Sequence, residues 1–268
     1  MNLQTVTSLL ALGISFIACT TSEPKLTDPN DYAMYLESND TSALKNAQLR
    51  LNFWNGKIDA DTTRIMAIHP VSTAYSQLFQ ITGDIKYLKN SEKILRKGVT
   101  IAAIKKEGYL LALARNYISQ HRFLEAESRA IEALSLDQNK KETQMVLFDV
   151  AMELGNYLEA EQYLHQFADQ KDFNFLIRLA KWNDYKGNLD ATIKYMEKAK
   201  VIAIQSKDDE LMLWTYTNLA DYYGHAGNLK ASYAHYLKAL AIDPSNAYAK
   251  KGIAWIVYSH EHNTQEAG

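Results

Sequence analysis

The chain has 268 residues, of which 29 are basic and 31 acidic, so its net charge is close to zero and indicates binding neither to nucleic acids nor to anionic surfaces. The single cysteine excludes a disulfide framework and a cysteine-based zinc site. Apolar residues make up 47% of the chain, enough for a substantial core, and the abundance of Leu, Ala and Lys with only 4 prolines favours helices over strands.

An apolar run near the N-terminus extends from Val6 to Ala18. It is too short to span a bilayer as a stable helix, but it suits the apolar region of a secretory signal. Cys19 follows directly, and the arrangement resembles a bacterial lipoprotein signal, which is cleaved before a cysteine that becomes lipidated. We therefore expect a signal peptide over residues 1–18, a lipid anchor on Cys19 and a flexible linker over residues 19–30. A conventional signal peptide and an ordinary apolar N-terminus are the alternatives.

The residue after the cysteine is Thr20 rather than Asp. By analogy with lipoprotein sorting in Gram-negative bacteria, this favours the outer membrane over the inner one. We expect a chain that faces the periplasm and touches the membrane through its lipid anchor only.

Two helices are expected next, over "DYAMYLES" and over "TSALKNAQLRLNFWNGKI", with Thr41 or Ser42 as the N-cap of the second. The stretch "DADTTRIMAIHP" is expected to be a loop that ends at Pro70. A first helical hairpin then follows, with its turn at Gly83 and Asp84.

Four further hairpins share one pattern, which is clearest over Leu213–Asn246. Large residues recur at three-and-four spacing on the first helix of each, and small residues face them from the second, so that two helices can pack closely. The second helix of each hairpin carries a small residue at one equivalent position, which is occupied by Ala126, Ala160, Thr192 and Ser232. The last interval is longer than the others, and we expect a charged loop at Ser206–Glu210.

This pattern resembles the tetratricopeptide repeat (TPR), a helix–turn–helix unit of about 34 residues. The resemblance implies an all-α, right-handed superhelical solenoid of about six units over residues 31–268, with the last unit incomplete. It also implies a function in protein binding, because the concave face of such solenoids holds an extended peptide or a helix.

The resemblance further implies which positions of each first helix line the concave face. They correspond here to Leu111, Arg115, Met145, Asp149, Met152, Lys181, Asp184, Tyr185, Trp214, Asp221, His225 and Trp255. We expect the groove itself at Arg115, Met145, Asp149, Lys181, Tyr185, Trp214, Asp221 and His225, with Tyr185 and Trp214 as anchors. The alternative for each position is an ordinary solvated or packing residue. The Lys and Asn pattern by which some members of the family clamp chaperone tails is not matched.

Motifs for chemistry are missing from the sequence: it has no Gly-rich phosphate loop, nucleophile elbow or HExxH segment. His260 and His262 would diverge on a helix, and His225 and His235 fall on different helices of one hairpin without an acidic or cysteine partner placed with them. We therefore expect no enzymatic activity, no metal and no cofactor.

At the C-terminal end of the predicted solenoid, "NTQEA" looks like the start of a second helix, and most of the cover is missing from Ile253, Trp255, Ile256 and Val257. We expect either a chain that is shorter than its family or an end that a partner or a second copy covers.

These features together predict a non-enzymatic, envelope-anchored scaffold that binds a protein or peptide in its groove. A peptidoglycan- or glycan-associated factor and a capture module for a small ligand are the alternatives.

Overall fold

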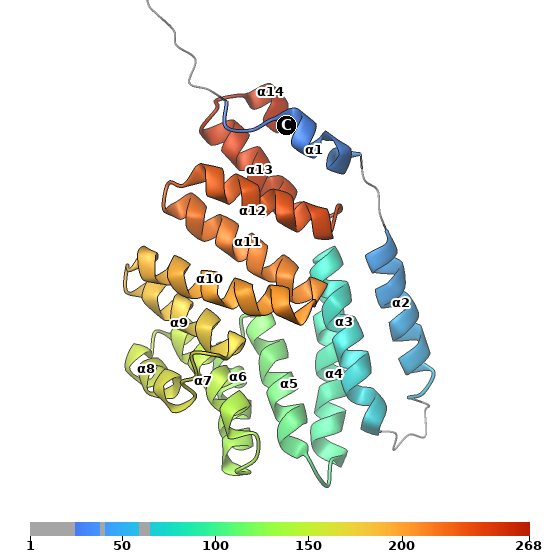
Figure 1. The fold of residues 1–268 in the computed structure, drawn as a ribbon. Helices are drawn as coiled ribbons and strands as arrows, with labels where there is room; N and C mark the ends of the chain where they lie inside the picture. Colours follow the sequence, from blue (N-terminus) through green and yellow to red (C-terminus); the bar gives the residue numbers. More distant parts are fainter. Residues whose placement is uncertain (1–24, 38–40, 59–64) are drawn as a thin grey trace, which may run out of the picture.

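The computed structural model describes residues 25–37, 41–58 and 65–268, and within these ranges the chain forms helices and no strands (Figure 1). The predicted signal peptide and Cys19 lie outside the described residues. The helices are α1 (Pro29–Leu36), α2 (Ser42–Asn55), α3 (Ile68–Thr82), α4 (Lys86–Ile101), α5 (Lys106–Ser119), α6 (Phe123–Ser135), α7 (Lys140–Leu154), α8 (Tyr157–Gln166), α9 (Phe173–Tyr185), α10 (Leu189–Ser206), α11 (Asp209–His225), α12 (Leu229–Ile242), α13 (Ala247–Ser259) and α14 (Thr264–Ala267).

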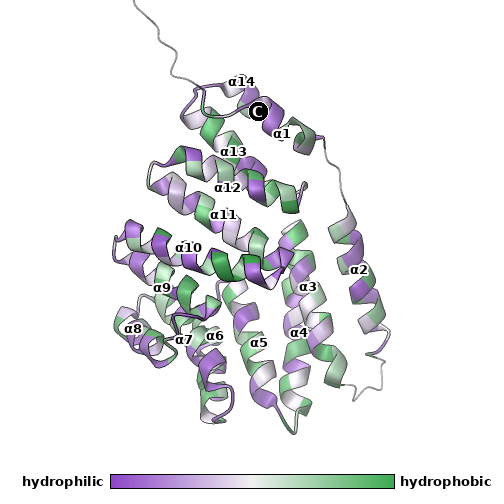
Figure 2. Cartoon of the chain, viewed as in Figure 1, coloured by the Kyte–Doolittle hydropathy of each residue, from purple (hydrophilic) through white to green (hydrophobic). Residues whose placement is uncertain are grey.

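The helices from α3 to α12 pack as five consecutive hairpins, as the repeat predicts. The small residues expected at the helix contacts are buried: Ala126, Ala160 and Thr192 are 0% exposed and Ser232 is 1% exposed. Each lets the partner helix approach closely, and Figure 2 shows hydrophobic and hydrophilic residues mixed along the helices. Gly227 makes one of the predicted turns with a φ of 74°, a left-handed conformation that favours glycine.

Two predicted loops differ from the structure. The connection after α10 consists of Lys207 and Asp208 alone, because α10 extends to Ser206 and α11 begins at Asp209. The longer interval between repeats therefore results from long helices and not from an inserted loop. The loop expected to end at Pro70 contains a 3-10 turn at Ile65–Ala67. Pro70 lies in the first turn of α3, where backbone N–H groups have no acceptor within the helix, so the lack of an N–H costs no hydrogen bond.

The first helices of the hairpins form the inner wall of the solenoid. α3 contacts α5, α5 contacts α7, α7 contacts α9 and α11 contacts α13, whereas no comparable contact joins the second helices in the described part of the chain. Helices touch along the inside of a curved stack and separate along the outside, so this asymmetry places the concave face on the odd-numbered helices. Across this face, the Gln77 side chain of α3 donates a hydrogen bond of 3.4 Å to Glu210 of α11.

The N-terminal segment crosses to the opposite end of the solenoid. Residues 25–36, here called the strap, lie against α12, α13 and α14 in Figure 1. Tyr32 of the strap is 5% exposed and joins an apolar cluster with Tyr233, Ile253 and Ile256. The part of the predicted linker that the structure describes, residues 25–30, therefore contacts the folded body.

The strap also overturns the prediction of an uncovered C-terminal end. Ile253, Ile256 and Val257 are at most 3% exposed, because α12, α14 and the strap surround α13. Only Trp255 remains open, with 48% of its surface exposed. The chain thus covers its own last repeat, and the end does not need a partner or a second copy to bury it.

Candidate functional site on the concave face

Charged side chains occupy the middle of the concave face, on α5, α7 and α9. Two nitrogens of the Arg178 guanidinium of α9 donate hydrogen bonds to Asp149 of α7, at 3.1 Å from Nε to Oδ1 and 2.6 Å from Nη2 to Oδ2. One turn further along, Lys181 of α9 forms an ion pair of 2.8 Å with Glu153 of α7. Asp149 and Lys181 are therefore on the predicted face, but each already has a partner in the adjoining repeat.

Arg115 of α5 differs from these residues, because its side chain makes no hydrogen bond or ion pair within the described residues. Its side chain is exposed, yet surrounding protein atoms desolvate it enough to lower its pKa, and the Arg178 charge adds to this effect against the attraction of Asp149 and Glu142. Arg115 is thus an exposed positive charge whose side chain has no partner on the predicted concave face.

Two exposed aromatic side chains lie on α9 and α11. Trp214 of α11 is 42% exposed and contacts Phe173 edge-on, with ring centroids 6.0 Å apart. Tyr185 of α9 is 47% exposed and stacks on Tyr157 at 3.8 Å. Both predicted anchors are therefore accessible, and each is held in position by a neighbouring ring.

Three other predicted positions are not free for a ligand. Met145 and Met152 of α7 are 5% and 9% exposed and pack in an apolar cluster with Phe148, because the close contact of α7 with α9 covers them. Leu111 of α5 is likewise buried. The expectation that Met145 lines the groove is contradicted by its burial in the core.

Asp221 of α11 is occupied by two tyrosines. Tyr236 of α12 donates to one carboxylate oxygen at 2.5 Å and Tyr248 of α13 donates to the other at 2.6 Å. The pKa of Tyr248 rises to about 12, mainly because of this bond to Asp221, so its hydroxyl stays protonated and continues to donate. Asp221 therefore links α11, α12 and α13, and both of its carboxylate oxygens already accept hydrogen bonds.

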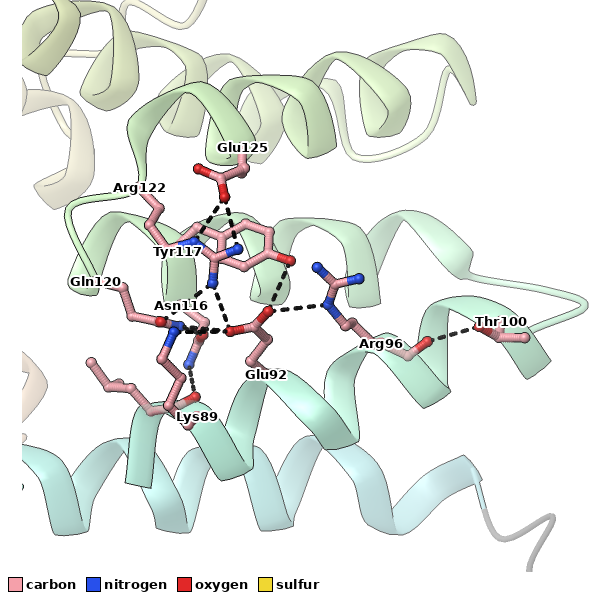
Figure 3. Close-up of polar contacts among 10 residues, drawn as sticks. Lys89, Glu92, Arg96, Thr100, Asn116, Tyr117, Gln120, Arg122 and Glu125 are labelled. Carbon is pink, nitrogen blue, oxygen red and sulfur yellow. Dashed lines mark hydrogen bonds and ion pairs between the residues drawn. The ribbon is translucent and has the colours of Figure 1, made fainter. Parts of the chain in front are cut away.

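A polar cluster that sequence reasoning missed lies between α4, α5 and α6 (Figure 3). Its centre is Glu92, which accepts hydrogen bonds from Arg122 at 2.8 Å, Arg96 at 3.1 Å, and Tyr117 and Gln120 at 3.3 Å. Burial opposes ionisation of Glu92, but these donors outweigh it and lower its pKa. With its oxygens engaged, Glu92 joins two hairpins. Only the spacing of Glu92 and Arg96, one helical turn apart, signals part of this cluster in the sequence.

His225 and His235, the two histidines of the α11–α12 hairpin, lie in different environments. His225 is exposed in the last turn of α11, whereas His235 of α12 is buried. His235 donates from Nδ1 to the Ala231 carbonyl at 2.7 Å, and its Nε2 has no hydrogen-bond partner and lies 3.8 Å from Glu197. Among the described residues there is no group of three metal-ligating side chains.

Acid is expected to destabilise the fold through His235. Burial lowers the pKa of this ring, with Lys200 and Lys238 adding to the effect. Since the unfolded value is about 6.5, the unfolded chain binds more protons as the pH falls below it, so stability is complete above that pH and declines until the pH passes the folded pKa. Urea unfolding at several pH values should show a shallower decline for His235→Phe, and an unchanged one for His225→Phe. An equal slope in all three proteins would contradict this assignment.

No helix among the described residues is long and apolar enough to cross a membrane.

Comparison with protein-family models and with curated proteins gives no match. Solved structures do match the fold. A chain of the Cut9–Hcn1 hetero-tetramer of the APC/C aligns with a TM-score of 0.61 at 18% identity, over 88% of this chain and 45% of that one, so this chain spans less than half of its length. A tetratricopeptide repeat protein from Parabacteroides merdae aligns with a TM-score of 0.55 at 16% identity, over 89% and 90% of the two chains. A thermophilic TPR protein in Thermus thermophilus aligns with a TM-score of 0.51 at 15% identity, over 71% and 98%.

At these identities the likeness concerns the fold alone. Together with the packed consecutive hairpins and the buried small residues, it shows that the chain folds as an all-α, right-handed superhelical solenoid of TPR helical hairpins.

Proposed function

We propose that the chain is a non-enzymatic scaffold that holds a protein or peptide partner on its concave face. The observation that carries this proposal is the state of Arg115, an exposed guanidinium without a side-chain partner at a predicted position of the concave face. The adjoining charges Asp149 and Arg178, and Lys181 and Glu153, are matched in pairs, whereas Arg115 is left for a ligand to neutralise. A carboxylate of the partner meets this requirement, because the planar guanidinium can bind both of its oxygens.

The exposed aromatic side chains of α9 and α11 add contact area for a partner. Trp214 and Tyr185 are accessible and rigidly held, which limits the entropy lost when a partner orders them. The partner is accordingly an acidic segment that also carries apolar side chains. Attachment to the envelope through a lipid on Cys19 belongs to the same proposal and places the scaffold on the periplasmic side, with the outer membrane favoured.

The test is crosslinking and affinity purification of a C-terminally tagged copy from solubilised envelope membranes. We expect one protein to be enriched with the wild type and reduced about tenfold or more by Arg115→Glu, since charge reversal leaves the partner's carboxylate desolvated and repelled. Trp214→Ala should reduce the same protein. Lys194→Glu, an equal charge change at an exposed site of α10, should leave it enriched. Equal enrichment with all variants would contradict a groove centred on Arg115.

A Cys19→Ala copy tests the anchoring separately. We expect this copy in the soluble fraction and the wild type in the membrane fraction. The same distribution for both copies would remove the lipid anchor from the proposal while leaving the groove in place.

A further inference from the structure

The strap fixes the N-terminal end of the described chain at the C-terminal end of the solenoid. Glu261, between α13 and α14, accepts the backbone N–H groups of Leu26 and Thr27 at 2.7 Å each and the Thr27 hydroxyl at 2.9 Å. Glu266 of α14 accepts the Tyr32 hydroxyl at 2.5 Å and pairs with Lys25 at 3.3 Å. With Thr27 and Tyr32 buried as well, the strap is bound along most of its length.

These contacts shorten the path from Cys19 to the folded body. Five residues separate Cys19 from Lys25, so even a fully extended chain spans at most about 22 Å between them. If folding began only at Ser42 of α2, the extended path from Cys19 would be about 80 Å. The strap therefore removes most of the reach that an N-terminal anchor would otherwise have.

We propose that the strap holds the α13–α14 end of the solenoid beside the lipid bilayer to which Cys19 is attached. This inference rests on the proposed lipid anchor and adds an orientation to it. The turn between α6 and α7 lies at the opposite end of the molecule in Figure 1, beyond α12, α11 and α10. Because packed helices are 8–10 Å apart, these layers keep that turn about 30 Å or more further from the anchor.

Photocrosslinking to lipid tests the orientation directly. Because Cys19 is the only cysteine, residues 19–268 can be coupled through it to a maleimide lipid in phosphatidylcholine vesicles. A benzoylphenylalanine replaces either Gln265 of α14 or Gln138 in the α6–α7 turn, both of which are exposed. We expect severalfold more lipid adduct from position 265 than from position 138. Equal adducts, or more from position 138, would overturn the proposal.

A variant with a released strap distinguishes the effect of the strap from that of attachment through Cys19. Glu261→Ala removes the acceptor of three strap hydrogen bonds, and the excess of adduct at position 265 should then fall severalfold. Glu159→Ala, at an exposed site of α8, serves as the matched control and should keep the excess. An excess that survives in Glu261→Ala, although hydrogen exchange shows residues 25–36 to be released, would show that the strap does not set the orientation. Since the vesicles supply the anchor chemically, failure of lipidation in cells cannot produce these outcomes.

Discussion

Gly252→Ala should lower the free energy of unfolding by about 2–3 kcal/mol, although alanine is the better helix former. Gly252 lies in α13 directly under the ring of Tyr236 from α12, and an added Cβ would be 2.2 Å from Cζ and 2.5 Å from two further ring atoms. The ring has little room to move, because Tyr236 is 6% exposed and its hydroxyl is bound to Asp221. The midpoint of urea unfolding measures the change.

A second helical glycine provides the matched control. At Gly224 of α11 an added Cβ would lie 3.4 Å from the Ser232 hydroxyl, so Gly224→Ala should be neutral or stabilise by up to about 1 kcal/mol. Removing the ring with Tyr236→Leu should also abolish most of the cost of Gly252→Ala in a double-mutant cycle. If Gly252→Ala changed the free energy of unfolding as little as Gly224→Ala, the close packing of Tyr236 of α12 on α13 would be contradicted.

The repeat could be predicted from the sequence because its cause is local. A small residue every 32 to 40 positions and a glycine at the turn require only neighbouring helices to explain them, and Ala160, Thr192 and Gly227 all have the predicted environment. Hairpin stacking therefore follows from the sequence pattern without knowledge of distant contacts.

The strap could not be predicted in this way. The spacing of Glu261 from Leu26 and Thr27 is more than 230 residues, and a carboxylate that accepts backbone N–H groups leaves no periodic pattern. Its helix α1 was expected, but its partner was not. The curvature of the whole stack brings the two ends together, and that curvature is the sum of many small rotations between repeats.

The candidate groove was predictable in part. Trp214 and Tyr185 are accessible and stay predicted anchors, whereas Met145 has a predicted concave position and is nonetheless buried. Whether a side chain at such a position is exposed or buried depends on how closely the first helices of adjoining repeats approach each other. That distance is set by side chains of both repeats. The same reason explains why Asp221 became a link between helices: its two tyrosine partners come from α12 and α13.

Glu261→Ala should release the strap and reduce stability by about 2–3 kcal/mol, because two backbone N–H groups and one hydroxyl lose a charged acceptor together. Hydrogen exchange followed by mass spectrometry should show faster exchange over residues 25–36. The effect should extend to α13, since Tyr32 covers the cluster that contains Ile253 and Ile256. Exchange in α5 and α6, which belong to a different apolar cluster, should not change.

Two variants distinguish loss of these bonds from a general effect of losing a carboxylate. Glu261→Gln keeps one oxygen that can accept, so its exchange over residues 25–36 should lie between the wild type and Glu261→Ala. Glu159→Ala removes an exposed carboxylate from α8 and should leave exchange in the strap unchanged. Protection of the strap that persists in Glu261→Ala would mean that the apolar contacts of Tyr32 suffice to hold it. Because α14 provides only one short turn, the strap then acts mainly as the missing second helix of the last repeat, with the hydrogen bonds to Glu261 setting its register and not its affinity.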